Sequence, residues 1–130
     1  MGREFKLAEV LSGAAIMKAQ DIVDGIHASD TLKDYVVRLV AATRDPKAAK
    51  LDSLVPLIEY GASPRCSMGL TTAAKARAFL DGRGYATPED VKAVAYDVAR
   101  HRIILTYEAE ARNMSTDDVI KTILDHVPVP

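Results

Sequence analysis

The most regular hydrophobic pattern in the chain lies between residues 31 and 44. Buried-type side chains recur there at the i, i+3, i+4 and i+7 spacing that lines one face of an α-helix, and they are Leu32, Tyr35, Val36, Leu39, Val40 and Thr43. The charged residues of this stretch fall on the opposite side. Asp45-Pro46 prevents continuation, so the pattern predicts an amphipathic helix that ends near Arg44, where a cation suits the negative end of the helix dipole.

Two outer helices are predicted on either side of the middle of the chain. Ser12 can cap a helix that carries Ile16 and Val23 at helical spacing, and Gly25 is expected to end it in a left-handed conformation. Near the C-terminus, the polar residues 113–116 can cap a last helix that is closed by Pro128. The inward positions of that last helix are Val119, Ile120, Ile123, Leu124 and Val127.

Two more helices are predicted between residues 64 and 99. The first runs from Pro64 to about Asp81, and its inner stripe is expected to be mostly small, so that another helix can come close; the stripe is Cys66, Gly69, Ala73, Ala76 and Leu80. The second begins at Pro88, with Thr87 as its capping residue. Its first turn carries two acids, and its apolar side is Val91, Val94, Ala95 and Val98.

The remaining segments complete an all-α prediction. Residues 47–60 are irregular but too apolar for a free loop, so we expect them to lie across the core and lead to Gly61. Ile103 to Leu105 are too few to classify by period. Residues 1–11 show no clear period and are assigned to a linker or to sequence added for expression. The prediction is a small helical domain over residues 12–130, with about five helices, one candidate short extended segment and no sheet beyond a short ribbon.

Composition narrows the class of protein. The chain has 130 residues, 48% of them hydrophobic and 27% charged, which suits one core and one domain. A net charge of −1 argues against duplex DNA or an anionic membrane as the main partner. The single cysteine permits no internal disulfide, as in a reducing compartment. With no apolar run of roughly 20 residues, we expect a soluble, cytoplasmic protein.

The stretch from Gly61 to Cys66 carries the candidate chemistry. Gly61 is expected to let the chain turn, Ser63 to cap the next helix through its hydroxyl, and Pro64 to take the first helical position. Arg65 would then stand in the first turn, where the helix dipole disfavours a cation unless an anion joins it. The sequence thus predicts an anion-binding corner, with an ordinary exposed arginine as the alternative.

Other catalytic and metal-binding patterns are missing. No Gly-Lys-Ser or Gly-Lys-Thr occurs, so a phosphate-binding loop is absent, no catalytic residue is assigned, and we expect the chain alone not to hydrolyse ATP. His27, His101 and His126 lack the spacings of zinc sites, so no metal is expected. Cys66 is either a reactive thiol with a lowered pKa beside Arg65 or a small residue on a packed stripe, and the second interpretation is favoured.

A family resemblance follows from several short motifs taken in order, namely Tyr35 to Arg44 (YVVRLVAATR), Gly61 to Arg65 (GASPR), Ala73 to Ala76 (AAKA), Gly82-Arg83, Tyr85, Thr87 to Val91 (TPEDV) and His101-Arg102. From about Ser12 to its end the chain resembles the C-terminal helical lid of MoxR-type AAA+ ATPases. The resemblance implies that Arg65 is the sensor-2 arginine, reaching the nucleotide phosphates. Cys66, Arg77 and Ala86 depart from the expected family choices.

The same resemblance implies partners and cofactors for an intact protein. ATP and magnesium would be bound mainly by an AAA+ core domain of the same polypeptide, and none is expected on the isolated chain. Neighbouring subunits of a ring oligomer and proteins with von Willebrand A-type domains would be the protein partners, in a chaperone-like or protein-maturation role.

Three alternatives remain at this stage. Within AAA+ proteins, the nearest is the lid of a magnesium-chelatase I-subunit-like ATPase. A stand-alone helical interaction module would leave Arg65 as an ordinary surface residue. A DNA-binding helix-turn-helix is disfavoured because the connection from Gly82 to Thr87 is long and two acids would face the phosphates.

Overall fold

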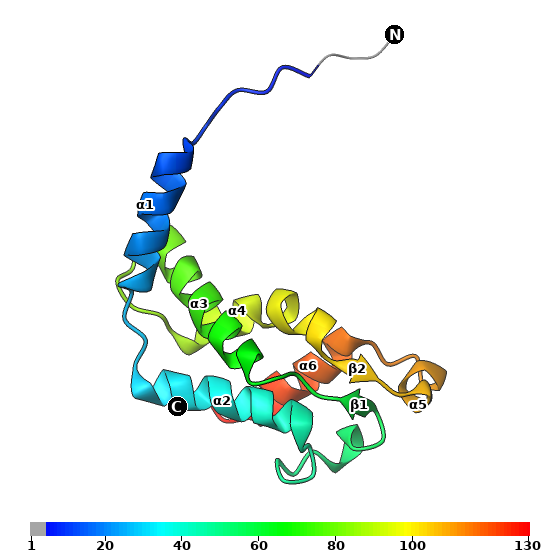
Figure 1. Ribbon diagram of the computed structural model, residues 1–130. Helices are drawn as coiled ribbons and strands as arrows, with labels where there is room; N and C mark the ends of the chain where they lie inside the picture. The colour runs from blue at the N-terminus through cyan, green and yellow to red at the C-terminus, as the bar shows by residue number, and fades with distance from the viewer. Residues whose placement is uncertain (1–4) are drawn as a thin grey trace.

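The computed structural model describes residues 5–130, which form six α-helices and one small β-ribbon at the side of the helices (Figure 1). The helices are α1 (Gly13–Asp24), α2 (Asp30–Arg44), α3 (Arg65–Leu80), α4 (Pro88–Ala99), α5 (Tyr107–Ala111) and α6 (Thr116–His126). The strands are β1 (Ile58–Tyr60) and β2 (Ile104–Leu105), and 3₁₀ turns occupy Asp52–Leu54 and Arg100–Arg102. Across these residues, no helix has both the length and the apolar character needed to span a membrane. The all-α prediction is confirmed, with α5 as a short helix that the sequence pattern did not reveal.

Helix α2 forms one wall of the hydrophobic core. Every residue of its predicted inner face is buried, from Leu32 to Thr43. The opposite walls come from α3, α4 and α6, whose apolar sides close the core against α2. The periodic pattern of residues 31–44 therefore predicted both the helix and its buried face, because apolar residues at helical spacing form the stripe that packs against the core.

The segment between α2 and α3 crosses the core, as predicted. Its buried side chains are Leu51, Leu54 and Leu57. It ends in β1, which pairs antiparallel with β2, so that Tyr60 lies opposite Ile104. Thr106, directly after β2, donates its hydroxyl to the carbonyl of Pro56 over 2.7 Å. These contacts hold the end of the segment in place where it leads into Gly61.

The inner stripe of α3 differs from the prediction. The buried residues are Cys66, Leu70, Ala74 and Ala78, whereas Leu80 is exposed. They recur every four residues, along a single ridge of the helix, whereas the predicted stripe alternated steps of three and four. The expected close approach of another helix is still present on the flank of α3, where a Cβ atom on Gly69 would lie 3.3 Å from Cγ1 of Val98 in α4.

Helix α1 begins as predicted but ends differently. The Ser12 hydroxyl accepts a hydrogen bond from the amide of Ala15 at 3.1 Å, which confirms the cap. Gly25, however, has φ −79°, a right-handed conformation, so the predicted left-handed stop is wrong. The helix ends instead with hydrogen bonds from the amides of Gly25 and Ile26 to the carbonyls of Ile22 and Val23. This ending does not require a residue with positive φ.

The start of α4 is held by a capping box and a buried ion pair. Thr87 accepts from the amide of Asp90, and the Asp90 carboxylate accepts from the amide of Thr87 at 2.8 Å. The Asp90 side chain is only 3% exposed, and Arg83 binds both of its oxygens, at 2.8 and 2.7 Å. Chiefly through these hydrogen bonds, Arg83 lowers the pKa of Asp90. The connection between α3 and α4 is thus organised around one carboxylate.

Replacing Thr87 with alanine removes the hydroxyl that caps α4. We expect the free energy of unfolding to fall by about 1 kcal/mol, the usual cost of losing such a cap. Urea denaturation followed by circular dichroism measures it. Thr72→Ala, at an exposed position within α3, is the matched control and should cost nothing, since alanine favours the helix interior. Equal stability of Thr87→Ala and the wild type would contradict the role of the cap.

Replacing Asp90 with asparagine breaks the ion pair with Arg83. We expect the free energy of unfolding to fall by about 2 kcal/mol. This is less than the ~3–5 kcal/mol expected on breaking a fully buried pair, because Arg83 still contacts water. Since the pKa of Asp90 is lowered in the folded state, its stabilising contribution is complete above the unfolded-state pKa of about 3.9 and is lost as the pH falls below that value. Wild type and Asp90→Asn should therefore differ in stability at pH 7 and converge in acid; a constant difference would contradict this.

Candidate functional site

The candidate corner begins where the chain passes over the end of α2. A Cβ atom on Gly61 would lie 2.2 Å from the carbonyl oxygen of Thr43 and 2.7 Å from Cα of Arg44, distances that no side chain can occupy. The conformation of Gly61 is not left-handed, since Gly82 is the positive-φ glycine of the described residues. Glycine is therefore required here for a close backbone approach, and not for the sharp turn that the sequence suggested.

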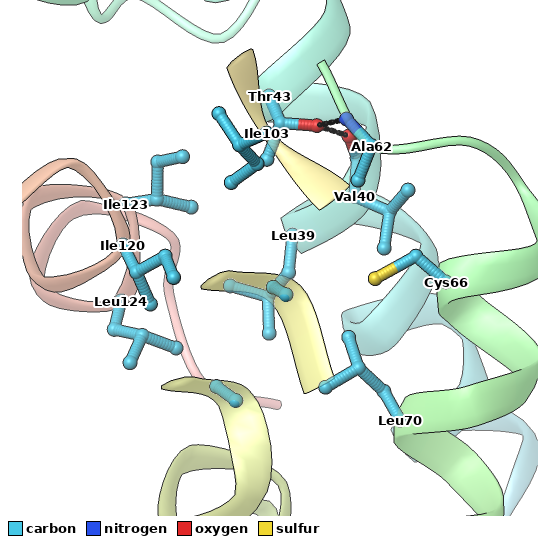
Figure 2. Close-up of a pocket in the computed structure, with 12 residues that line it drawn as sticks. Leu39, Val40, Thr43, Ala62, Cys66, Leu70, Ile103, Ile120, Ile123 and Leu124 are labelled. Atoms are coloured by element: carbon cyan, nitrogen blue, oxygen red, sulfur yellow. Dashed lines mark hydrogen bonds between the residues drawn. The ribbon is translucent and has the colours of Figure 1, made fainter. Parts of the chain in front are cut away.

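The next residue is hydrogen-bonded to the same turn of α2. The amide of Ala62 donates to the hydroxyl of Thr43 over 2.9 Å, and that hydroxyl donates to the carbonyl of Val40 over 2.7 Å (Figure 2). Ala62 and Thr43 are both buried. Because Thr43 uses its hydroxyl as acceptor and donor at once, the polar groups at this crossing are satisfied inside the core.

Helix α3 then starts at Arg65, one residue later than predicted. No side-chain hydrogen bond caps it, so the prediction that the Ser63 hydroxyl is the N-cap is wrong. The backbone closes the first turn instead, with the amide of Cys66 donating to the carbonyl of Ser63 at 2.8 Å and the amide of Ser67 to that of Pro64 at 3.0 Å. A tight turn of this kind satisfies the amides that a capping hydroxyl would otherwise bind.

The side chain of Arg65 is exposed to solvent. Residues 63–65 are exposed, between the buried residues Ala62 and Cys66. Within residues 5–130, Arg65 takes part in no ion pair, and the first turn of α3 contains no acid. The structure thus brings Gly61, Ser63, Pro64 and Arg65 together at one corner and leaves the guanidinium group open to a partner.

Other charged side chains stand around this corner. Arg44 lies against the backbone of Gly61, and with Lys47 and Glu59 it lines a shallow groove beside it. Arg102 is near enough to Cys66 for its charge to act on the thiol. The sequence pointed to Arg102 only through the family motif, because 36 residues separate Cys66 from Arg102 and no local pattern connects them.

Cys66 is a packing residue beneath the corner. Its side chain is fully buried and lines a small apolar cavity of about 20 Å³ between α2, α3, α4 and α6 (Figure 2). Burial raises the pKa of the thiol, and the nearby charge of Arg102 opposes that rise only in part. A lowered pKa is therefore not found, and the interpretation of Cys66 as a small packed residue is the one that the structure supports.

Metal-binding groups do not gather at the corner. In the part of the chain from Phe5 onward, no three His, Cys, Asp or Glu side chains lie close enough to hold an ion. The chemistry that the corner offers is the exposed guanidinium group of Arg65 on a well-anchored turn, which suits a phosphate or another small anion.

The sequence of the chain is similar to those of known proteins. The family model of the AAA lid domain matches residues 55–123. Chaperone MoxR1 of Mycobacterium tuberculosis is 39% identical over 122 residues, which are 94% of this chain and 32% of that protein. Protein MoxR of Paracoccus denitrificans is 38% identical over 117 residues, 86% of this chain and 34% of its own length.

A solved structure is similar over most of the chain. A candidate ATPase from Cytophaga hutchinsonii superposes with a TM-score of 0.87 at 42% sequence identity, over 90% of this chain and 36% of that one. The chain therefore spans about a third of the length of the proteins that it matches.

Replacing Gly61 with alanine tests whether the close approach is required. The added methyl group would overlap the backbone of Thr43, so the end of α2 and the corner must separate, and we expect a loss of about 1–3 kcal/mol, as for other overpacked sites. Thermal melting of the chain measures it. Gly84→Ala is the matched control, because a Cβ atom there meets nothing within 4 Å. Equal melting temperatures for the two variants would contradict the constraint.

Proposed function

Because this chain belongs to the AAA lid domain family and is a C-terminal lid of the MoxR type, we propose that Arg65 is its sensor-2 arginine. In an intact ATPase, Arg65 would contact the phosphates of ATP held by the nucleotide-binding core. The observation that carries the proposal is the corner itself: Arg65 is exposed and unpaired among the described residues, on a turn whose neighbours Ala62 and Cys66 are buried.

The contrast between Arg65 and Arg83 supports this assignment. Arg83 already binds Asp90 through two hydrogen bonds and also donates to Asp81. Its guanidinium group is therefore occupied by contacts within the domain. Arg65 has no such partner among residues 5–130. A guanidinium group can grip a terminal phosphate with two donors, and phosphate would supply the negative charge that the first turn of α3 lacks.

The anchoring of the corner explains how a phosphate contact could move the whole lid. Gly61 and Ala62 are fixed to α2, and Cys66 is fixed in the core, so Arg65 cannot shift far without the domain. If the phosphate is lost by hydrolysis, the contact that joins lid and core is lost with it. ATP turnover would then change the position of the lid as a rigid body.

The wider assembly is part of the same proposal. ATP and magnesium would be held mainly by the core domain, and the ATPase would work as a ring of subunits. Its role would be chaperone-like, on partners with von Willebrand A-type domains. The support is the similarity to MoxR proteins, one of which is named a chaperone. Among the alternatives, these matches favour the MoxR type over the magnesium-chelatase type.

Substitution of Arg65 in the full-length ATPase tests the proposal. We expect Arg65→Ala to lower ATP turnover by roughly 10- to 1,000-fold, since arginines placed against developing phosphate charge have effects of this order. Arg65→Lys should recover only part, because a point charge replaces a two-donor grip. Steady-state ATPase assays measure both.

Two controls make this result specific. Thermal melting of the isolated lid should be the same for wild type and Arg65→Ala, because the side chain is exposed. Arg38→Ala removes another exposed arginine, in the middle of α2, and should leave turnover nearly unchanged. Full activity of Arg65→Ala would favour the reading of Arg65 as an ordinary surface residue, and unfolding of its lid would contradict the proposal by showing that the side chain supports the fold.

A further inference from the structure

A groove lies beside the C-terminal half of α2, and the turn after α2 and the segment after α6 form its other walls. We call it the alanine groove. Its volume is about 460 Å³, which falls in the range of pockets that hold ligands in proteins. No residue from Gly61 to Arg65 lines it, so the corner takes no part in it. The apolar lining residues are Ala41, Ala42, Ala48, Ala49, Val127 and Pro128.

Small side chains give the alanine groove its depth. Each of its four alanines ends at Cβ, so another chain can come close to the backbone of α2 and of the turn after it. Ala42 is buried at the floor, whereas Ala41 and Ala48 are exposed. An apolar side chain placed there would remove both its own surface and that of the alanines from water, which favours binding.

The charge available at the alanine groove is positive. Lys50 is exposed and takes part in no ion pair within residues 5–130. The acid of the lining, Asp45, accepts from the amide of Ala48 at 2.9 Å and so caps the turn. Arg38 also lines the groove, but its guanidinium group lies over the ring of Tyr35, 5.8 Å from the centroid. The ammonium group of Lys50 is therefore the charge left for a partner.

Lys50 occupies a backbone position that glycine would fill with less strain. Its φ is 59°, and within residues 5–130 the other positive-φ residues are Gly82 and Asn113, types that adopt this conformation readily. The amide of Leu51 donates to the carbonyl of Pro46 at 2.8 Å, and the amide of Lys50 donates three residues back at 3.0 Å. Such an ending usually has glycine where Lys50 stands. A strained lysine beside a groove indicates that its side chain has a use.

A hydrogen bond between distant segments fixes this end of the groove. Nε2 of His126, the last residue of α6, lies 3.1 Å from the carbonyl oxygen of Ala49. Because a carbonyl can only accept, the ring nitrogen donates. The turn that carries Lys50 is thus joined to α6, and both Lys50 and His126 line the groove. Walls fixed in this way lose little freedom when a partner binds.

We propose that the alanine groove binds a segment of a partner protein in which an apolar side chain stands beside an aspartate or a glutamate. The apolar side chain would lie on the alanines, and the carboxylate would pair with Lys50. Charge complementarity selects an acidic occupant, because a basic one would face an unpaired ammonium group. This docking site goes beyond the contact of Arg65 with nucleotide and does not depend on it.

Selection from a random peptide library tests this inference. Dodecapeptides displayed on phage are selected against the 130-residue chain without nucleotide, and the affinity of the enriched peptides is measured by fluorescence anisotropy. We expect these peptides to combine apolar residues with Asp or Glu. Absence of enrichment, or enrichment of basic peptides, would overturn the inference. Octanoate bound at the groove, with no peptide enriched, would also overturn it, since the occupant would then be a fatty acid.

Two substitutions separate binding at Lys50 from a structural role. Lys50→Gln should weaken the enriched peptides by about five- to tenfold, the effect of losing a partly desolvated ion pair. Lys50→Gly should weaken them equally and yet raise the melting temperature, because glycine relieves the positive φ. A lysine that served only the fold would not show higher stability together with lower affinity.

Ala41→Leu and Lys47→Gln complete the test. Ala41 is exposed on α2, so leucine there should fill the groove and abolish binding while the melting temperature stays nearly the same. Lys47 is an exposed cation of the same turn that does not line the groove, and Lys47→Gln is the matched control for charge. Binding that survives Ala41→Leu, or that falls as far in Lys47→Gln as in Lys50→Gln, would overturn the inference.

Discussion

The backbone of Gly61 passes against the backbone of Thr43 and Arg44, and the position of the first turn of α3 depends on that contact. Any side chain at residue 61 would push the two segments apart. Once they touch, the amide of Ala62 reaches the Thr43 hydroxyl, and Ala62 and Cys66 enter the core on either side of residues 63–65. Exposure of Arg65 is therefore a consequence of how its neighbours are buried.

A second polar centre holds the opposite end of α3. The carboxylate of Asp90 is buried at the start of α4, where it satisfies Thr87 and binds Arg83 with both oxygens. Because Arg83 lies in the connection between α3 and α4, this ion pair fixes how one helix follows the other. Both ends of α3 are therefore anchored, at the corner before Arg65 by the contact with α2 and at the connection to α4 by the ion pair of Asp90.

Much of this organisation could be predicted from local sequence. The period of residues 31–44 gave α2 and its buried face, and the caps at Ser12 and Thr87 placed the starts of α1 and α4. These signals were reliable because caps and amphipathic periods act between residues three or four apart. Gly61 to Arg65 could be singled out from the sequence as a candidate corner, since they are contiguous and match a family motif, and the role of Arg65 stays a prediction. The bounds of α3 were predicted to within one residue and the burial of Cys66 was expected, but the predicted cap at Ser63 was wrong.

Only the tertiary structure decided the rest, because the remaining contacts join residues distant in sequence. The inward face of α3 depends on which neighbours cover it, so Leu70 and Ala78 replaced the predicted stripe and Leu80 stayed outside. The sequence by itself determined the helices α1, α2, α3, α4 and α6, the caps at Ser12 and Thr87, and the choice of Arg65 as the candidate arginine. The fold decided which arginine forms an ion pair within the domain. A carboxylate lies within reach of Arg83, and among the described residues none forms an ion pair with Arg65.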